Sequence, residues 1–380
     1  MENFISNNTT ALHFGKGVVD NLAKTLDLKG RNVLIVYGKG SVKRSGLFDN
    51  VMGQLVASGA HVAEFGGIKP NPLVEDVENA AALARAHNTD LIIAIGGGSV
   101  IDSAKIISIT IPVGHPAWNF YTRRAIPKTA VPLVAILTLA ATGTEMNPFA
   151  VLQNLATGQK EGYGHPLCYP KHSFLDPTLT ITVPKDYTAY GVADLIAHCL
   201  EAYFGKGDCP LSDRFIFAII GDAMEHGPQL LDNLTDYDLR AKIMYDATMA
   251  LNGLTTQGKV NGDWGVHGIG HILSLLYDTP HGASLTIAYP AWMKLHREKA
   301  AERISKLGTN LFGTADVDKT IKGFEDFFRK ISCPVRLSDA GILNSETGKI
   351  ISCLVKNNVN GSNYRLTETD YQMLLSNMQA

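Results

Sequence analysis

The chain has 380 residues, of which 45% are apolar and 18% are charged, a composition typical of globular proteins. Its formal net charge of −2 at pH 7 argues against binding to nucleic acid or to an anionic membrane surface. The longest strongly apolar run, VPLVAILTLAA, is too short to span a bilayer. We therefore expect a folded protein of more than one domain, with neither a nucleic-acid nor a membrane partner.

The first residues and the cysteines predict a cytoplasmic location. The stretch MENFISNNTTALHFGKG lacks the basic start and the apolar run of a secretory signal. The five cysteines are odd in number and form no CxxC pair. They indicate free thiols in a reducing compartment rather than a disulfide framework or a zinc finger.

The first half of the sequence alternates between strand-like and helix-like periodicity. The apolar runs that read as buried strands are 32–38, 60–67, 91–98 and 131–138. The intervening segments with helical spacing are 46–59, 71–90 and 99–110. Strands and helices in alternation predict a parallel sheet wound with helices.

The pattern changes within FLDPTLTITVPKDYT, residues 174–188, after which strand-like runs nearly vanish. Pro184 is expected in the first turn of a helix. The later segments with helical periodicity are 187–204, 211–227, 238–254 and 296–312. We predict an α/β domain over residues 1–182 and an all-helical domain over residues 183–380.

Three loops rich in glycine or threonine follow predicted strands. They are YGKGSVKR at 37–44, IGGGSVIDSAK at 95–105 and TLAATGTE at 138–145. Glycines let the backbone approach a phosphate, and the following helix offers free N–H groups. Neither of the first two loops is a complete dinucleotide or ATPase fingerprint, and one such loop alone can serve packing. Because all three would lie at the carboxyl edge of the sheet, where ligands bind, they favour a dinucleotide site.

Polar residues in the helical half could hold a metal ion. In YGVADLIAHCLEAY, Asp194 and His198 are four residues apart and project from one helical face. The later cluster of histidines consists of His267, His271 and His281. A catalytic metal takes three or four ligands from separate elements, which this pair and two of the later histidines would supply. The residues alone leave open which two these are, and whether Glu201 is a ligand instead.

With these residues assembled, the sequence resembles the iron-containing (group III) alcohol dehydrogenase family, and within it the NADP-dependent aldehyde reductase and butanol dehydrogenase branch. The motifs that carry the resemblance run in order along the chain: FGKG, GGGSVID, TLAATGTE, FLDP, DLIAHCLE and the H…GH…PHG series. The resemblance implies a Rossmann-like dinucleotide-binding domain followed by an all-helical metal-binding domain, in a dehydroquinate synthase-like architecture.

The resemblance also assigns roles to residues. It implies one divalent metal ion, Fe, Zn, Ni or Mn, bound by Asp194, His198, His267 and His281. His271 would stand unligated beside the nicotinamide as a candidate catalytic residue, and Glu201 would be structural. Asp102, the other catalytic candidate, would lie near the nicotinamide ribose. The further implied coenzyme contacts are Asn71, Gly97, Gly98, Ser99, Thr138, Thr142 and Lys160.

The implied activity is that of a metal-dependent, NADP(H)-linked alcohol dehydrogenase or aldehyde reductase, a homodimer that acts on a small, butanol-like primary alcohol or its aldehyde. One rival is a dehydroquinate-synthase-like, NAD-dependent lyase, which would need a cluster of basic side chains that the helical half lacks. A second rival is a non-catalytic nucleotide-binding module. Such a module would have little use for converging metal ligands.

Two features disagree about the coenzyme. Glu64 ends the second predicted strand, where an acidic residue can bind the ribose 2′-hydroxyl of NAD. The loop after the first strand instead lacks a carboxylate. Its residues are Gly38, Lys39, Gly40 and Ser41, followed by Lys43 and Arg44. Because a nearby like charge is what excludes a 2′-phosphate, we predict NADP(H) over NAD(H).

Overall fold

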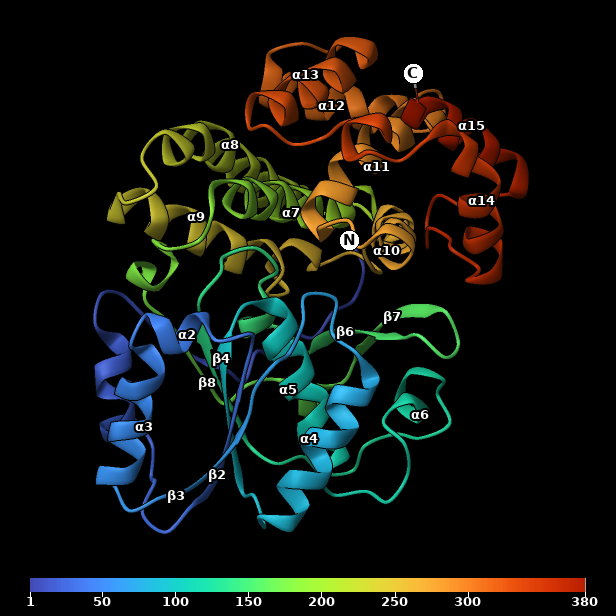
Figure 1. Cartoon of the computed structure of the whole chain (residues 1–380). Helices are drawn as coiled ribbons and strands as arrows, with labels where there is room; N and C mark the ends of the chain where they lie inside the picture. Colours follow the sequence, from blue (N-terminus) through green and yellow to red (C-terminus); the bar gives the residue numbers. More distant parts are fainter. Residues whose placement is uncertain (380) are drawn as a thin grey trace. The chain divides into compact units, whose positions relative to one another are not determined.

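The computed structural model describes residues 1–379, which form two compact units (Figure 1). One unit is Asn7–Thr182, and the other combines Met1–Ser6 with the chain from Val183 onward. The sequence analysis placed residues 1–6 in the α/β domain, whereas Glu2 N donates a hydrogen bond to Gly258 O at 2.8 Å in the helical unit. The division into a dinucleotide-binding domain over 1–182 and a metal-binding, catalytic domain over 183–380 stays a prediction.

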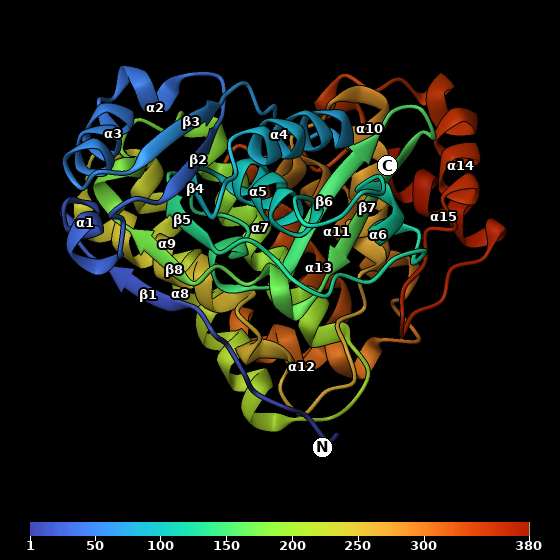
Figure 2. The same ribbon diagram turned by 90° about the horizontal axis from the view of Figure 1, so that it is seen from below.

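The α/β unit is built on a six-stranded sheet in the order β1-β8-β5-β4-β2-β3, in which all neighbours are parallel (Figure 2). The strands are β1 (Ala11–Phe14), β2 (Asn32–Tyr37), β3 (His61–Phe65), β4 (Leu91–Gly96), β5 (Leu133–Leu137) and β8 (His172–Leu175). The helices are α1 (Leu22–Thr25), α2 (Ser41–Arg44), α3 (Leu47–Ala57), α4 (Val74–Ala86), α5 (Gly98–Thr110) and α6 (Trp118–Tyr121). The predicted parallel sheet wound with helices is confirmed.

Burial of apolar side chains on both faces stabilises this sheet. β4 and β5 are buried along their whole length, as expected for central strands of a parallel sheet. On one face, alternate residues of β2, β4 and β5 pack against α1 and α3 in a single apolar cluster. α4 and α5 cover the opposite face (Figure 1).

An antiparallel hairpin of β6 (Phe149–Asn154) and β7 (Gln159–Gly164) stands apart from the main sheet. The sequence analysis did not predict it. Two backbone groups tie it to the helices of the unit: Val151 N donates to Asp102 Oδ2 at 2.9 Å, and Gln153 N donates to Pro72 O at 2.8 Å. The hairpin therefore lies beside α5 and the segment that leads into α4.

The strand order reverses direction between β2 and β4. From β2 the chain goes first to β3 on one side and then crosses to β4 on the other. In open α/β sheets, ligands bind outside the carboxyl ends of the strands at such a switch point. The loops after β2 and β4 are the first two glycine-rich loops of the sequence, so the fold brings them together where a nucleotide site is expected.

The second unit is helical, and residues 183–379 contain no strand. Its helices are α7 (Lys185–Phe204), α8 (Pro210–Asp232), α9 (Tyr237–Ala250), α10 (Gly265–Tyr277), α11 (His281–Leu295), α12 (Ala301–Phe312), α13 (Val317–Lys330), α14 (Thr347–Lys356) and α15 (Glu368–Gln379). α7 is buried from Gly191 to Phe204 and packs against α8, α9 and α11. Pro184 is the N-cap of α7 and not a residue of its first turn, because its ψ of 154° is extended.

Two simpler predictions concern the whole chain. The five cysteines are all free thiols, as predicted. Within residues 1–379, no helix combines the length and the apolar character needed to cross a membrane.

Candidate metal centre and coenzyme loops

The middle of α7 carries two of the candidate ligands. Asp194 and His198 are only 2% and 4% exposed, in a helix whose other buried residues are nearly all apolar. His198 Nδ1 lies 3.8 Å from Asp194 Oδ1. Because a buried carboxylate is costly unless a partner compensates its charge, this pair indicates a site rather than ordinary packing.

The other two candidates come from α10 and α11, which pack against each other. His267 lies in the first turn of α10, and His281 is the first residue of α11. His267 Nε2 and His281 Nε2 lie 3.9 Å and 3.7 Å from Asp194 Oδ1. Three helices thus bring imidazole nitrogens to within 3.7–3.9 Å of one carboxylate oxygen.

This donor set fits a divalent cation. Ligand atoms about 2.0–2.1 Å from a tetrahedral ion are about 3.4 Å apart, slightly less than the distances seen here. The candidate ligand atoms of Asp194, His267 and His281 all lie within 4.8 Å of one another. His198 is outside this tightest group, but its Nδ1 is buried without a hydrogen-bond partner. Burial, assisted by nearby His267, holds the pKa of His198 well below its ordinary value, so its imidazole is neutral and able to ligate.

Glu201 lies behind His267 rather than among the ligand atoms. Its Oε1 is hydrogen-bonded to His267 Nδ1 at 2.8 Å and accepts a hydrogen bond from His267 N at 2.9 Å. Burial raises the pKa of Glu201, whereas the hydrogen bonds from the backbone of His267 and Trp264 favour its ionised form. With Nδ1 engaged by Glu201, His267 presents Nε2 to Asp194.

His271 lies one helical turn beyond His267 and is half-buried. Its ring centre is 5.4 Å from that of His281, yet it does not belong to the tightest group of ligand atoms. This placement is compatible with an unligated neighbour of the metal. Its catalytic role stays a prediction.

In the α/β unit, the second and third glycine-rich loops contact each other closely. A Cβ on Gly98 would lie 2.9 Å from Thr142 Cγ2, and one on Gly97 would lie 3.2 Å from Leu139 Cβ. A side chain at Gly98 would therefore require Thr142 to move, and one at Gly97 would crowd Leu139. Gly97 is also the N-cap of α5 and offers no side-chain cap, so the first N–H groups of α5 are left for a ligand or water.

The other predicted coenzyme residues lie around these loops. Ser99 is in the first turn of α5, and Thr138 N donates to Gly96 O at 3.0 Å. Asn71 has the left-handed φ of 57°, and its Oδ1 accepts a hydrogen bond from Lys160 Nζ at 2.7 Å. Because Lys160 belongs to β7, the hairpin brings its ammonium group to the loop before α4.

Asp102 is held by the protein itself. Its Oδ1 accepts a hydrogen bond from Thr144 Oγ1 at 2.5 Å, and its Oδ2 accepts one from Val151 N. Both oxygens therefore position the segment 144–151, and the predicted contact with a ribose stays a prediction.

The sequence analysis missed a buried lysine beside Asp102. Lys105 on α5 is 0% exposed. The acceptors of its ammonium group are Thr144 Oγ1 (2.6 Å), Asn147 Oδ1 (3.1 Å) and Phe149 O (2.7 Å). These use all three donors of an ammonium group. The sequence did contain a signal for this buried lysine. Lys105 is the one charged residue in the run SAKIISIT, and a helical run with only one charged residue has no side that faces solvent.

The loop after β2 leads directly into α2. It comprises Gly38, Lys39, Gly40 and Ser41, with Gly40 at a left-handed φ of 103° before the helix. Glu64 on β3 faces this loop, and its Oε2 lies 2.8 Å from Lys43 Nζ and 3.1 Å from Tyr37 OH. The hydrogen bond from Lys43 holds the pKa of Glu64 below its usual value. Glu64 is therefore a paired carboxylate, and the Lys43 ammonium is already engaged.

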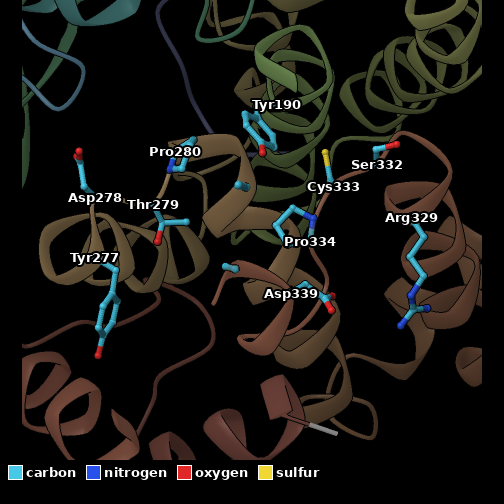
Figure 3. A pocket seen from close by; sticks show the side chains of 12 residues that line it. Tyr190, Tyr277, Asp278, Thr279, Pro280, Arg329, Ser332, Cys333, Pro334 and Asp339 are labelled. Atoms are coloured by element: carbon cyan, nitrogen blue, oxygen red, sulfur yellow. The ribbon is translucent and has the colours of Figure 1, made fainter. Parts of the chain in front are cut away.

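A cavity of about 630 Å³ lies in the helical unit (Figure 3). It is lined by the connection between α10 and α11, including Asp278, Thr279 and Pro280, and by the segment after α13, including Cys333. None of the four candidate ligands is among its lining residues. The converging imidazoles, and not this cavity, define the candidate site.

The fold and the donor set agree with the sequence comparisons. A family model described as "Iron-containing alcohol dehydrogenase" matches residues 9–177, and one described as "Fe-containing alcohol dehydrogenase family, C-terminal" matches residues 188–377. The chain belongs to the iron-containing alcohol dehydrogenase family.

Individual relatives match over nearly the whole chain. A protein of Bacillus subtilis named "Probable NADH-dependent butanol dehydrogenase 1" is 39% identical over 384 residues, covering 99% of both chains. The "NADPH-dependent aldehyde reductase YqhD" of Escherichia coli is 34% identical over 379 residues, covering 97% of both. The crystal structure of an NADH-dependent butanol dehydrogenase A from Thermotoga maritima superposes with a TM-score of 0.96 at 34% identity, covering 100% of this chain and 99% of that one.

Proposed function

We propose that this protein is a metal-dependent, NADP(H)-linked alcohol dehydrogenase or aldehyde reductase that acts on a small, butanol-like primary alcohol or its aldehyde. The observation that carries the proposal is the convergence of three imidazoles on Asp194 Oδ1 at 3.7–3.9 Å. Membership of the family and the names of its relatives support the activity class.

Each group in the helical unit has a proposed task. Asp194, His198, His267 and His281 hold a divalent ion, which is Fe, Zn, Ni or Mn. When bound, the ion would act as a Lewis acid that polarises the substrate carbonyl, and the coenzyme would supply or accept the hydride at its nicotinamide ring. His271, half-buried and next to His281, carries a proton between the substrate and solvent.

In the α/β unit, the glycine-rich loops take the coenzyme. Gly97, Gly98 and Ser99 approach the pyrophosphate at the start of α5, with Thr138 and Thr142 beside them. Asn71 and Lys160, joined by their hydrogen bond, act as one further contact. Asp102 orients the segment 144–151 and faces the nicotinamide ribose.

Preference for NADP(H) rests on charge. The loop Gly38–Ser41 contains no carboxylate to repel a 2′-phosphate. Glu64, the one residue that argued for NAD(H), is paired with Lys43 and presents little net negative charge. The relatives differ on this point, since some are named as NADH-dependent and others as NADPH-dependent.

The direct test is to incubate the purified protein with butanal and NADPH and to follow the absorbance of the reduced nicotinamide. We expect consumption of NADPH that stops in His267→Ala. A dehydroquinate-synthase-like lyase would leave butanal untouched and show no net coenzyme turnover, and a non-catalytic module would bind NADPH without consuming it. The homodimer is a proposal that rests on the family resemblance, and the cytoplasmic location is one that rests on the free cysteines.

A further inference from the structure

The start of α10, which carries His267, lacks a cap of its own. Its N-cap residue is Trp264, which makes no side-chain cap hydrogen bond and has the left-handed φ of 65°. An indole can donate a hydrogen bond but cannot accept one, so it cannot satisfy the free N–H groups of the first turn. Trp264 is also a bulky residue in a conformation that such residues rarely adopt. Something outside α10 must hold this turn.

Glu201 of α7 supplies the hydrogen-bond acceptors that the side chain of Trp264 lacks. Its Oε2 accepts a hydrogen bond from Trp264 N at 2.5 Å, and its Oε1 accepts one from His267 N at 2.9 Å. The carboxylate is 1% exposed and therefore does not exchange these bonds for water. In effect, a buried carboxylate from one helix caps the N-terminus of another, where the helix dipole also favours negative charge.

The same carboxylate reaches the side chain of the candidate ligand. Glu201 Oε1 lies 2.8 Å from His267 Nδ1, while His267 Nε2 faces Asp194 Oδ1 at 3.9 Å. A carboxylate that already accepts backbone hydrogen bonds is an acceptor for Nδ1–H. The proton of a neutral His267 imidazole is thereby placed on Nδ1, which leaves the lone pair on Nε2 for the ion.

We propose that Glu201 is the positioning residue of the metal centre: it fixes the backbone of His267 by capping α10, and it fixes the tautomer of its ring through Nδ1. This goes beyond the structural role that the family resemblance implies, and it rests on the metal site proposed above. α7 then supplies two ligands directly and orients a third. One rigid helix presents these three groups at spacings of four and three residues.

The test measures Zn²⁺ affinity, by competition with a chelator, in the full-length protein. Loss of such a partner typically weakens metal binding by about 10- to 100-fold, and we expect this for Glu201→Leu. Glu201→Gln keeps one acceptor oxygen of nearly the same shape and should recover part of the affinity. Zn²⁺ affinity of folded Glu201→Leu equal to that of the wild type would overturn the proposal.

Asp213→Asn is the matched control. Asp213 on α8 is also 1% exposed, and its carboxylate accepts hydrogen bonds from Lys259 Nζ at 2.9 Å and Arg303 Nη1 at 2.6 Å, neither of which belongs to α10. We expect this variant to lose thermal stability and to keep the Zn²⁺ affinity of the wild type. Equal loss of affinity in Asp213→Asn and Glu201→Leu would mean that Glu201 acts only through stability.

A second measurement tests the proposal even if the Glu201 variants fail to fold, because it uses the wild-type protein. In the ¹⁵N NMR spectrum of metal-free wild-type protein labelled at histidine, with His267→Gln used for assignment, we expect His267 as the Nδ1–H tautomer. The Nε2–H tautomer would contradict the proposal. Failure of the wild type to bind Zn²⁺ would instead count against the metal site itself, and the tautomer would still decide the role of Glu201.

Discussion

At the residue scale, the candidate ligands of the metal centre surround one carboxylate oxygen. Asp194 Oδ1 lies 3.7–3.9 Å from nitrogens of His198, His267 and His281. The proposed ion would compensate the charge of this buried carboxylate, so metal removal should lower the stability of the helical unit.

A variant of His271 can show whether a histidine close to this centre is also a metal ligand. It is one turn from His267, with its ring 5.4 Å from that of His281. We expect His271→Ala to retain its metal, to lower kcat by about 10²- to 10⁴-fold as for loss of a general acid or base, and to change the pH profile of kcat. A variant with unchanged kcat at every pH would remove His271 from the mechanism.

Lys39 tests the coenzyme preference. It is exposed in the loop after β2, so Lys39→Asp would place a carboxylate where we expect the 2′-phosphate. Charge-assisted hydrogen bonds contribute about 1.5–3 kcal/mol, so kcat/KM for NADPH relative to NADH should fall about 10- to 100-fold. Lys29→Asp, the same charge change before the amino end of β2, should leave the ratio unchanged. If the wild type prefers NADH, Glu64 and not the loop after β2 indicates the coenzyme correctly.

The sequence could supply the candidate residues but not the choice among them. The spacing of Asp194 and His198 placed both on one helical face. For the later histidines, however, His267 and His271 share a face of the same helix, so periodicity could not separate them. The family resemblance made that choice. The packing of α10 against α11 then brings His281, and not His271, into the tightest group with Asp194.

At the element scale, strands with long apolar runs were predictable and short ones were not. The predicted runs at 32–38 and 91–98 correspond to β2 and β4. β1 and β8 have only four residues each, too few to show a period. The β6–β7 hairpin includes the polar segment QKEGYG, which makes contacts distant in sequence, such as that of Lys160 with Asn71. Local pattern carries no signal of such contacts.

Lys105 joins α5 to the loop that follows β5. Burial lowers the pKa of Lys105 to about 8, although nearby Asp102 opposes the shift, so its ammonium form prevails at pH 7. Lys105→Met would remove the ammonium donor from three acceptors, of which Asn147 Oδ1 keeps another donor, Phe149 N. Breaking such a buried charged network costs about 3–5 kcal/mol, so a large fall in the denaturant midpoint is expected. Lys128→Met, at an exposed site, should have no such effect.

At the scale of the whole molecule, one buried carboxyl makes stability depend on pH. Burial, and next the charge of Asp222 on α8, raises the pKa of Asp246 on α9 to about 8. The folded state therefore keeps a proton that the unfolded chain releases near pH 4. The stability contributed by this proton is present in acid and is lost as pH rises from about 4 through about 8.

Asp246→Asn should remove this dependence, because an amide donates a hydrogen bond to Asp222 at any pH. We expect the variant to unfold at a higher temperature than the wild type at pH 9, by several degrees for a gain of about 1–2 kcal/mol, and the difference to shrink at pH 6. The exposed Asp232→Asn serves as control. A temperature difference that is constant between pH 6 and pH 9 would show that Asp246 ionises normally.

The central claim is that Asp194, His198, His267 and His281 hold one divalent ion in this member of the iron-containing alcohol dehydrogenase family. Elemental analysis of purified His267→Ala beside the wild type tests it most directly. We expect about one divalent ion per chain in the wild type and in His271→Ala, as for a site with a single set of four ligands, and loss of that ion in His267→Ala with the fold retained. Full metal occupancy in His267→Ala would contradict the account.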